Sequence, residues 1–266
     1  MSWKLCLITG ASAGIGAAFA RKYAEEGWDL ALTARRKDRL EALAKELTAQ
    51  HDIDVLTISA DLSDSRAPEN IVEAIENQGR HVDALVNNAG YGLPGVFTSA
   101  PWRTHADFIQ LMMTAPAHLI RLVLPGMQER KFGRIINVCS VAGYVPGARG
   151  HTLYGASKAF LIKTSQSLHL ENARYGVHVT ALSPGFTYSE FHDVNNTREM
   201  VSKTSRWMWQ SAEAVVESGY DAVENNVPMR VPGFHNKVIT TLSRVLPESW
   251  ALGIMAKQSE KIRNAS

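Results

Sequence analysis

The sequence is poor in cysteine, which excludes several protein classes. It contains 2 cysteines, Cys6 and Cys139, in 266 residues, and both lie within short apolar runs. Two thiols cannot form the disulfide framework of a small secreted protein, and a buried free cysteine behaves as a small hydrophobic residue. We therefore expect reduced thiols and a cytoplasmic protein.

Long hydrophobic runs, one-sided charge and metal-ligand clusters are also missing. There is no run of 18 consecutive apolar residues, and the run that starts at Leu5 is too short for the apolar part of a signal peptide, so we expect no transmembrane segment and no leader. Lys and Arg number 28 against 26 Asp and Glu, with the two signs interspersed, so nucleic acid is not an expected partner. His, Cys, Asp and Glu show no metal-ligand spacing, and we expect no metal site.

Up to about residue 183, short apolar runs alternate regularly with amphipathic stretches. The apolar runs predict strands at 4–9, 29–34, 54–60, 82–87, 133–140 and 176–183. The amphipathic stretches predict helices at 14–27, 38–51, 66–79, 105–130 and 153–175. Strands that are apolar throughout are typically covered by helices on both faces, and strand–helix alternation implies parallel strands with right-handed crossovers. The expected fold is a single-domain α/β Rossmann-type doubly wound parallel sheet with helices on both faces.

The chain after residue 185 is less regular, but no linker or composition break separates it from the rest. We therefore expect one domain over 1–266. Residues 207–226 predict a loop that enters a helix, 227–233 a last short strand, and 234–262 two short helices.

A glycine-rich turn, ITGASAGIG at residues 8–16, follows the first predicted strand and opens the first predicted helix. Gly10, Gly14 and Gly16 allow a tight turn and a close approach to a ligand, and a helix N-terminus offers N–H groups to an anion. Ser12 adds a hydroxyl donor for a phosphate. This order of strand, glycines and helix is typical of dinucleotide-binding folds, and a glycine-rich turn without a ligand is the alternative.

The second predicted strand ends without the carboxylate that binds an adenosine ribose in many dinucleotide folds. Ala34 stands in its place, and Arg35 and Arg36 follow. A guanidinium in place of a carboxylate favours a 2′-phosphate, so we expect NADP(H) rather than NAD(H). The alternative is that both arginines are a solvated helix start. Asp61 and Asn88 follow the next two strands at the ligand-binding edge of such a sheet, although Asp61 also suits a turn.

Residues 140–158, SVAGYVPGARGHTLYGASK, carry the candidate chemistry. Tyr154 and Lys158 are four residues apart on a predicted helix and so share a face. An ammonium group beside a phenol is expected to lower the phenol pKa, which would let Tyr154 exchange a proton with a substrate oxygen. Ser140 ends the fifth strand and can hold the same oxygen by a hydrogen bond.

The sequence resembles the short-chain dehydrogenase/reductase family over about residues 1–190. The matching motifs occur in the family's order: TGASAGIG (9–16), DL (61–62), NNAG (87–90), Ser140 before VAG, YGASK (154–158) and SPG (183–185). The resemblance implies a homodimer or homotetramer. It also implies that Tyr154 is the acid/base, that Ser140 orients the carbonyl, and that Lys158 binds the nicotinamide ribose and tunes Tyr154.

The resemblance further implies a set of cofactor-binding residues. The pyrophosphate and adenosine side is expected to be lined by Gly10, Ser12, Gly14, Ile15 and Gly16. The remaining contacts would be Arg35 on the 2′-phosphate, Asp61 and Leu62 on the adenine, Asn88 in the ribose region, and Thr187 near the carboxamide, with Ser189 two residues further keeping a hydroxyl.

One position departs from the family pattern. Met112, in LMMTA, occupies the place of an Asn that helps hold a water next to the lysine, largely through its main-chain carbonyl at a local kink. A thioether donates no hydrogen bond and accepts only weakly. We expect the carbonyl to hold the water still, with a slower proton relay. A catalytically impaired NADP(H)-binding regulator or scaffold is the alternative function, and an isomerase or dehydratase of the same fold is a third.

Residues 186–235 are expected to form a substrate lid, followed by a C-terminal helical extension at 236–266. The lid is rich in large apolar side chains: Phe186, Tyr188, Phe191, Trp207, Met208 and Trp209. Such groups favour a small hydrophobic ketone or aldehyde, or its alcohol, as the substrate. The alternative is that the tryptophans pack the C-terminal helices on the core. His151 and His192 are interpreted as pocket-wall or surface residues rather than catalysts.

Overall fold

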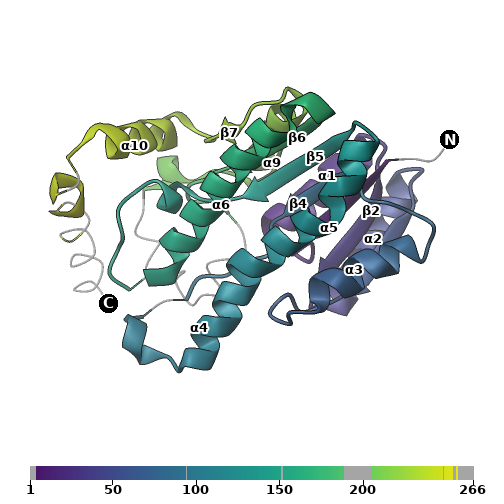
Figure 1. Ribbon diagram of the computed structural model, residues 1–266, viewed down its shortest axis with the longest axis horizontal. Coiled ribbons are helices and arrows are strands. Elements are labelled where there is room, and N and C mark those ends of the chain that lie inside the picture. The colour runs from purple at the N-terminus through teal and green to yellow at the C-terminus, as the bar shows by residue number, and fades with distance from the viewer. Residues whose placement is uncertain are drawn as a thin grey trace.

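The computed structural model describes residues 4–93, 95–150, 152–188, 205–247, 249–253 and 256. A parallel sheet of seven strands, in the order β3-β2-β1-β4-β5-β6-β7, forms its centre (Figure 1). The strands are β1 Leu5–Thr9, β2 Asp29–Ala34, β3 Val55–Ser59, β4 Ala84–Asn87, β5 Gly133–Val138, β6 Val177–Leu182 and β7 Met229–Arg230. The predicted doubly wound fold is confirmed.

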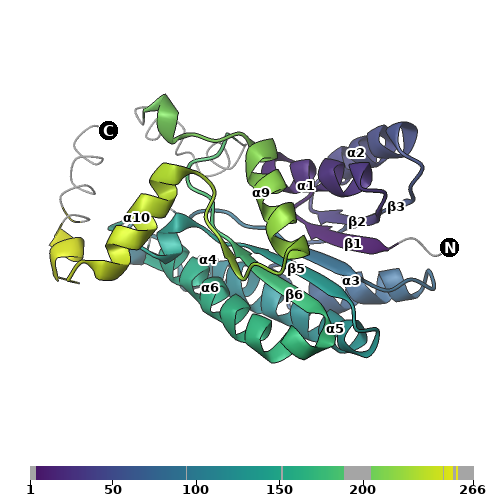
Figure 2. The same ribbon diagram turned by 90° about the horizontal axis from the view of Figure 1, so that it is seen from above.

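Helices cover both faces of the sheet, because each central strand carries apolar side chains on both sides. Figure 2 shows α1 (Gly14–Glu25), α2 (Lys37–Gln50) and α9 (Ala212–Glu224) on one side. The opposite side is covered by α3 (Ala67–Glu76), α4 (Trp102–Ile109), α5 (Ala115–Glu129) and α6 (Thr152–Asn172). In β1, Cys6 and Ile8 join the core under α1, while Leu5 and Leu7 join the core under α5.

The long helix predicted over 105–130 is confirmed as a helical stretch over Trp102–Glu129, but it contains a π-helical turn that the prediction did not include. A single π-helical turn, Gln110–Thr114, separates α4 from α5, and the N–H of Ala115 donates to the carbonyl of Gln110 five residues earlier. Pro116 supplies a physical reason, because proline has no N–H and its ring crowds the carbonyl four residues before it. That carbonyl belongs to Met112, which therefore loses its α-helical donor.

The stretch Trp102–Glu129 is long and apolar enough to cross a membrane by length and composition, although no such segment was expected. In the described structure one face of this stretch packs on the sheet. Phe108, Leu119 and Met127 are fully buried there among the apolar residues of β1, β4 and β5. Packing of a core helix thus accounts for its apolar character.

The C-terminal part follows the predicted order of loop, helix, strand and helix. After α9 and β7, the chain forms α10 over Phe234–Val245, while most of the second helix predicted within 234–262 lies outside the described residues. Val215 and Val223 of α9 are buried with α1 in the sheet core. Part of the region expected to form a lid is therefore a structural cover of the sheet.

Candidate active site

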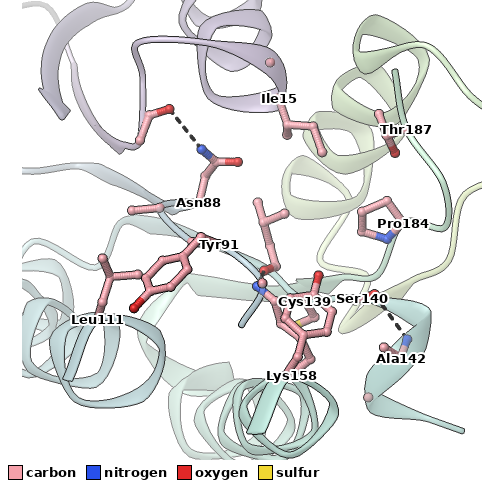
Figure 3. A pocket seen from close by; sticks show the side chains of 18 of the residues that line it. Ile15, Asn88, Tyr91, Leu111, Cys139, Ser140, Ala142, Lys158, Pro184 and Thr187 are labelled. Atoms are coloured by element: carbon pink, nitrogen blue, oxygen red, sulfur yellow. Dashed lines mark hydrogen bonds between the residues drawn. The ribbon is translucent and has the colours of Figure 1, made fainter. Parts of the chain in front are cut away.

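A cavity of about 830 Å³ opens at the carboxyl ends of the strands, where β1 and β4 lie side by side and their following helices leave to opposite faces. This switch point is the usual ligand site of such sheets. Figure 3 shows Lys158, Cys139 and Ser140 close together, with Tyr91 and Leu111 to one side and Pro184 and Thr187 to the other. The structure brings into this one cavity almost all predicted site residues: Gly10, Ser12, Gly14, Ile15, Arg35, Asp61, Leu62, Asn88, Ser140, Tyr154, Lys158 and Thr187.

Gly16 is the exception, since this last residue of the glycine-rich turn does not line the cavity. A Cβ on Gly16 would collide with the carbonyl oxygen of Gly10. Gly10 itself has φ +67°, and a Cβ there would lie 2.8 Å from the Cα of Ala89. The glycines therefore let the β1–α1 turn pack tightly against the turn after β4 and expose its backbone to the cavity.

Asn88 fixes this close approach. Its Nδ2 donates to the carbonyls of Thr9 (2.9 Å) and Gly10 (3.3 Å), and the Thr9 hydroxyl accepts from the N–H groups of Asn88 (2.9 Å) and Ala89 (3.0 Å). The resemblance placed Asn88 in the ribose region. The structure shows its amide N–H groups committed to the glycine-rich turn, so it holds the turn in place.

Of the two arginines after β2, Arg36 is the one that contacts the glycine-rich turn. Its Nε and Nη2 donate to the Ser12 hydroxyl at 3.2 and 3.0 Å. Arg35 is exposed and also lines the cavity. The sequence argument named both arginines, and the family resemblance gave the 2′-phosphate to Arg35. The contact between Arg36 and Ser12 could not be predicted, because it joins residues 24 positions apart.

Asp61 is both a turn residue and a residue of the cavity wall, which are the two roles that the sequence suggested for it. Its carboxylate accepts from the N–H (3.0 Å) and hydroxyl (2.8 Å) of Ser63, which makes it a turn residue. It lines the cavity as well, beside the buried Leu62.

Ser140, Tyr154 and Lys158 meet at the centre of the cavity. The Tyr154 phenol forms a hydrogen bond with the Ser140 side chain. The Lys158 ammonium lies 5.8 Å from the centre of the Tyr154 ring and donates to the carbonyl of Val138 at 2.8 Å. The helix α6 places Tyr154 and Lys158 on one face, as their spacing predicted.

The expected lowering of the Tyr154 pKa is not found, and that prediction was wrong. Burial raises the pKa of Tyr154 to about 12, against the smaller lowering effect of the Ser140 hydrogen bond. Burial also lowers the pKa of Lys158 to about 8. Desolvation is the dominant cause of both pKa shifts, and the Lys158 ammonium donates to the Val138 carbonyl.

The cavity wall also includes apolar or aromatic residues that the sequence argument did not single out, namely Tyr91, Leu111, Val145, Pro146 and Ala148. The ring of Tyr91 packs edge-on against Phe108. Periodicity could not reveal these residues, because they come from loops and from the π-helical turn.

The expected lid is only partly described. Phe186 and Thr187 line the cavity, and Trp209 stacks on Tyr188 with ring centres 4.9 Å apart. Trp207 is exposed. The predictions for His151, Ser189, Phe191 and His192 lie outside the described residues.

The fold, with a glycine-rich turn at its switch point, defines a dinucleotide-binding α/β protein. A family model described as "short chain dehydrogenase" matches residues 4–200. The chain belongs to this family of oxidoreductases.

Three similar proteins are informative. An uncharacterized oxidoreductase of Myxococcus xanthus is 32% identical over 247 residues, which are 93% of this chain and 94% of the relative. An "NADP-dependent 3-hydroxy acid dehydrogenase" of Salmonella typhi is 39% identical over 68% of this chain and 71% of its own length. A short-chain dehydrogenase from Sphingobium yanoikuyae, solved in complex with NADPH, has a TM-score of 0.80 and 29% identity, covering 92% of this chain and 97% of that one.

Proposed function

We propose that this protein is an NADP(H)-dependent oxidoreductase that interconverts a hydrophobic ketone or aldehyde and its alcohol. The observation that carries the proposal is the meeting of the Tyr154 phenol, the Ser140 side chain and the Lys158 ammonium in one cavity that also contains the glycine-rich turn.

The cavity fits NADP(H). Gly10 lets the turn after β1 pack directly on Ala89, and the start of α1, with its free backbone N–H groups, borders the cavity where a pyrophosphate can bind. Arg35 and Arg36 supply two guanidinium groups at the same end for a 2′-phosphate. The NADPH complex of the Sphingobium protein and the NADP dependence named for the Salmonella relative support this choice.

Each of the three candidate catalytic side chains has its own role in the proposed reduction. Bound NADPH would supply the hydride for the carbonyl carbon. The Tyr154 hydroxyl, which stays protonated because burial raises its pKa to about 12, donates a proton to the carbonyl oxygen in the reductive direction. Ser140 orients that oxygen, and the nearby Lys158 ammonium stabilises the phenolate that remains.

The substrate end favours an uncharged, apolar carbonyl compound. Among the described residues that line the cavity, the cations are Arg35, Arg36 and Lys158. The first two lie with the glycine-rich turn, and Lys158 serves the acid/base group. A hydroxy acid such as the Salmonella relative's name implies would need a further cation for its carboxylate.

A carbonyl and alcohol panel with both cofactors tests this function. We expect NADPH oxidation with hydrophobic ketones or aldehydes, and Tyr154→Phe should lower kcat by about 100- to 10,000-fold because the proton donor is lost. Tyr144→Phe is a matched control, because it also removes one phenol hydroxyl. That hydroxyl accepts from the Ser183 side chain after β6, and Tyr144 does not line the cavity. Activity that survives in Tyr154→Phe would refute the assignment.

A catalytically impaired NADP(H)-binding regulator is the second candidate, and Met112 is the observation that favours it. Tight NADPH binding without turnover across the whole panel would support that function instead. The cytoplasmic location and the homodimer or homotetramer remain predictions.

A further inference from the structure

The short segment 184–187, which follows β6, forms the wall of the cavity beside Ser140. All four of its residues line the cavity, and Figure 3 shows Pro184 close to Ser140 with Thr187 on the same side. The carbonyl of Pro184 accepts from the N–H of Val141, the residue that follows Ser140, at 3.0 Å. The position of this segment therefore affects the shape of the site around Ser140.

The amide of Asn236, from the first turn of α10, packs directly on Gly185 of this segment. A Cβ on Gly185 would collide with Oδ1 of Asn236 and would lie 2.6 Å from its Nδ2 and 2.7 Å from its Cγ. These are the three nearest heavy atoms, so one side group accounts for the close contact. Gly185 does not have a positive φ, and its backbone conformation therefore does not require glycine. The closeness of the Asn236 amide does.

Hydrogen bonds and burial hold the Asn236 amide in place. The residue is 3% exposed, and its Nδ2 donates to the carbonyl of Pro232 at 2.8 Å. The same Nδ2 lies 3.2 Å from the side-chain amide of Gln210. A buried amide that is bonded in this way cannot turn aside without leaving a polar group unsatisfied. It therefore acts as a fixed stop against which Gly185 rests.

Gln210 makes a second connection between the start of α10 and the same wall. Its backbone N–H donates to the carbonyl of Phe186 and its carbonyl accepts from the N–H of Tyr188, both at 2.9 Å. Its side chain packs on Gly233, where a Cβ would lie 3.0 Å from the Gln210 amide. Both Asn236 and Gln210 thus join the start of α10 to the wall segment, although α10 follows that segment by almost 50 residues.

We propose that Asn236 is a positioning residue whose buried amide sets the place of Gly185, and with it the wall at 184–187 against which the nicotinamide binds. The inference rests on the proposed function, which requires the nicotinamide to lie beside Ser140 and Tyr154 so that the hydride reaches the carbonyl carbon. Asn236 is not among the described residues that line the cavity. It acts through Gly185, without contact to cofactor or substrate.

A pair of alanine substitutions tests the contact, with NADPH affinity measured by calorimetry. Gly185→Ala places a methyl group against the Asn236 amide and should weaken NADPH binding about tenfold, because the wall must move. Adding Asn236→Ala removes the three atoms that the methyl group meets, so the double variant should bind NADPH more tightly than Gly185→Ala alone. Losses that simply add in the double variant would overturn the proposal.

Two controls separate positioning from general stability. Adenosine 2′,5′-bisphosphate carries the adenosine half of NADP(H) without the nicotinamide, and its affinity should stay unchanged in Gly185→Ala. Thr240→Val alters a buried side chain one turn further along α10, whose hydroxyl donates to the Asn236 carbonyl at 3.0 Å. We expect this variant to lower the Tm and to keep the NADPH affinity. Equal losses for both ligands in Gly185→Ala, or weaker NADPH binding in Thr240→Val, would mean a purely structural role and would refute the proposal.

Crystal structures of Gly185→Ala and of the double variant decide the question without any ligand. We expect the segment 184–187 to be displaced from Ser140 in Gly185→Ala and to return in the double variant. A wall that stays in place while the Asn236 side chain moves would overturn the proposal. If Gly185→Ala does not fold, the double variant should fold, and its failure to do so would count against the contact. A protein that binds NADPH but reduces no carbonyl compound would refute the proposed function and leave these readouts intact.

Discussion

The two ends of the large cavity are built in different ways. At the nucleotide end, backbone segments pack directly on one another, since the turn after β1 lies against the turn after β4. Hydrogen bonds of Asn88 and Thr9 hold the two turns together. Beyond Ser140, side chains from the loop that follows β5 form much of the wall, as with Val145 and Pro146. The first construction tolerates little change, whereas the second can vary in shape without disturbing the sheet.

Among substitutions that contrast the two ends of the cavity, those in the charged part of the nucleotide end should give the largest effect. Arg35→Ala should lower kcat/KM with NADPH by about 10- to 150-fold while leaving the value with NADH nearly unchanged, because a charge-assisted contact to the 2′-phosphate is lost. Arg36→Ala should act in the same direction and also loosen the turn through Ser12. Lys37→Ala, an exposed neighbour paired with Glu41, is the control. Equal losses with both cofactors in Arg35→Ala would contradict the assignment.

A glycine-to-alanine substitution made once in the glycine-rich turn and once in the loop after β5 tests whether the two parts of the site differ in their tolerance to change. Gly16→Ala places a Cβ against the Gly10 carbonyl and should cost about 1–3 kcal/mol of unfolding free energy, with weaker NADPH binding. Gly147→Ala meets no atom within 4 Å and should preserve both the Tm and the NADPH affinity, with changes confined to KM for bulky substrates. Thermal unfolding and NADPH titration of the pair test this. A stability loss in Gly147→Ala that matches Gly16→Ala would remove the distinction.

The smallest effect is expected at the π-helical turn. Met112→Asn should raise kcat by less than about tenfold, because a polar group near Lys158 speeds the proton relay. The same change should lower the Tm, since Met112 is 1% exposed and packs against Gly90. An unchanged or lower kcat would show that the thioether does not slow the relay.

The strands and most helices were predictable because their apolar pattern reports directly on burial. The π-helical turn within the long helix was not predictable, since the apolar pattern continues through Gln110–Thr114, and only Pro116 gives a local sign of it. The glycine-rich turn and the Tyr154–Lys158 pair were predictable from residue spacing, because each lies within one local element, a turn or a helix, whose geometry is fixed.

Other properties of the site depend on packing between distant segments. The direction of the Tyr154 pKa shift follows from burial, which spacing along a helix does not reveal. The contact of Arg36 with Ser12 and the packing of the Asn236 amide on Gly185 each join segments that are far apart in the sequence. The sequence could identify the chemical groups but not the environment that sets their ionisation.

The fastening of Thr9 to Asn88 also has a consequence for the folding pathway. These hydrogen bonds join residues 79 positions apart, and the β1–β4 pairing beside them is equally non-local. Contacts of such long separation carry a loop-closure cost before they contribute stability, so we expect the glycine-rich turn to reach its ligand-binding shape later than the local strand–helix units. A dinucleotide that binds this shape stabilises the native state by mass action.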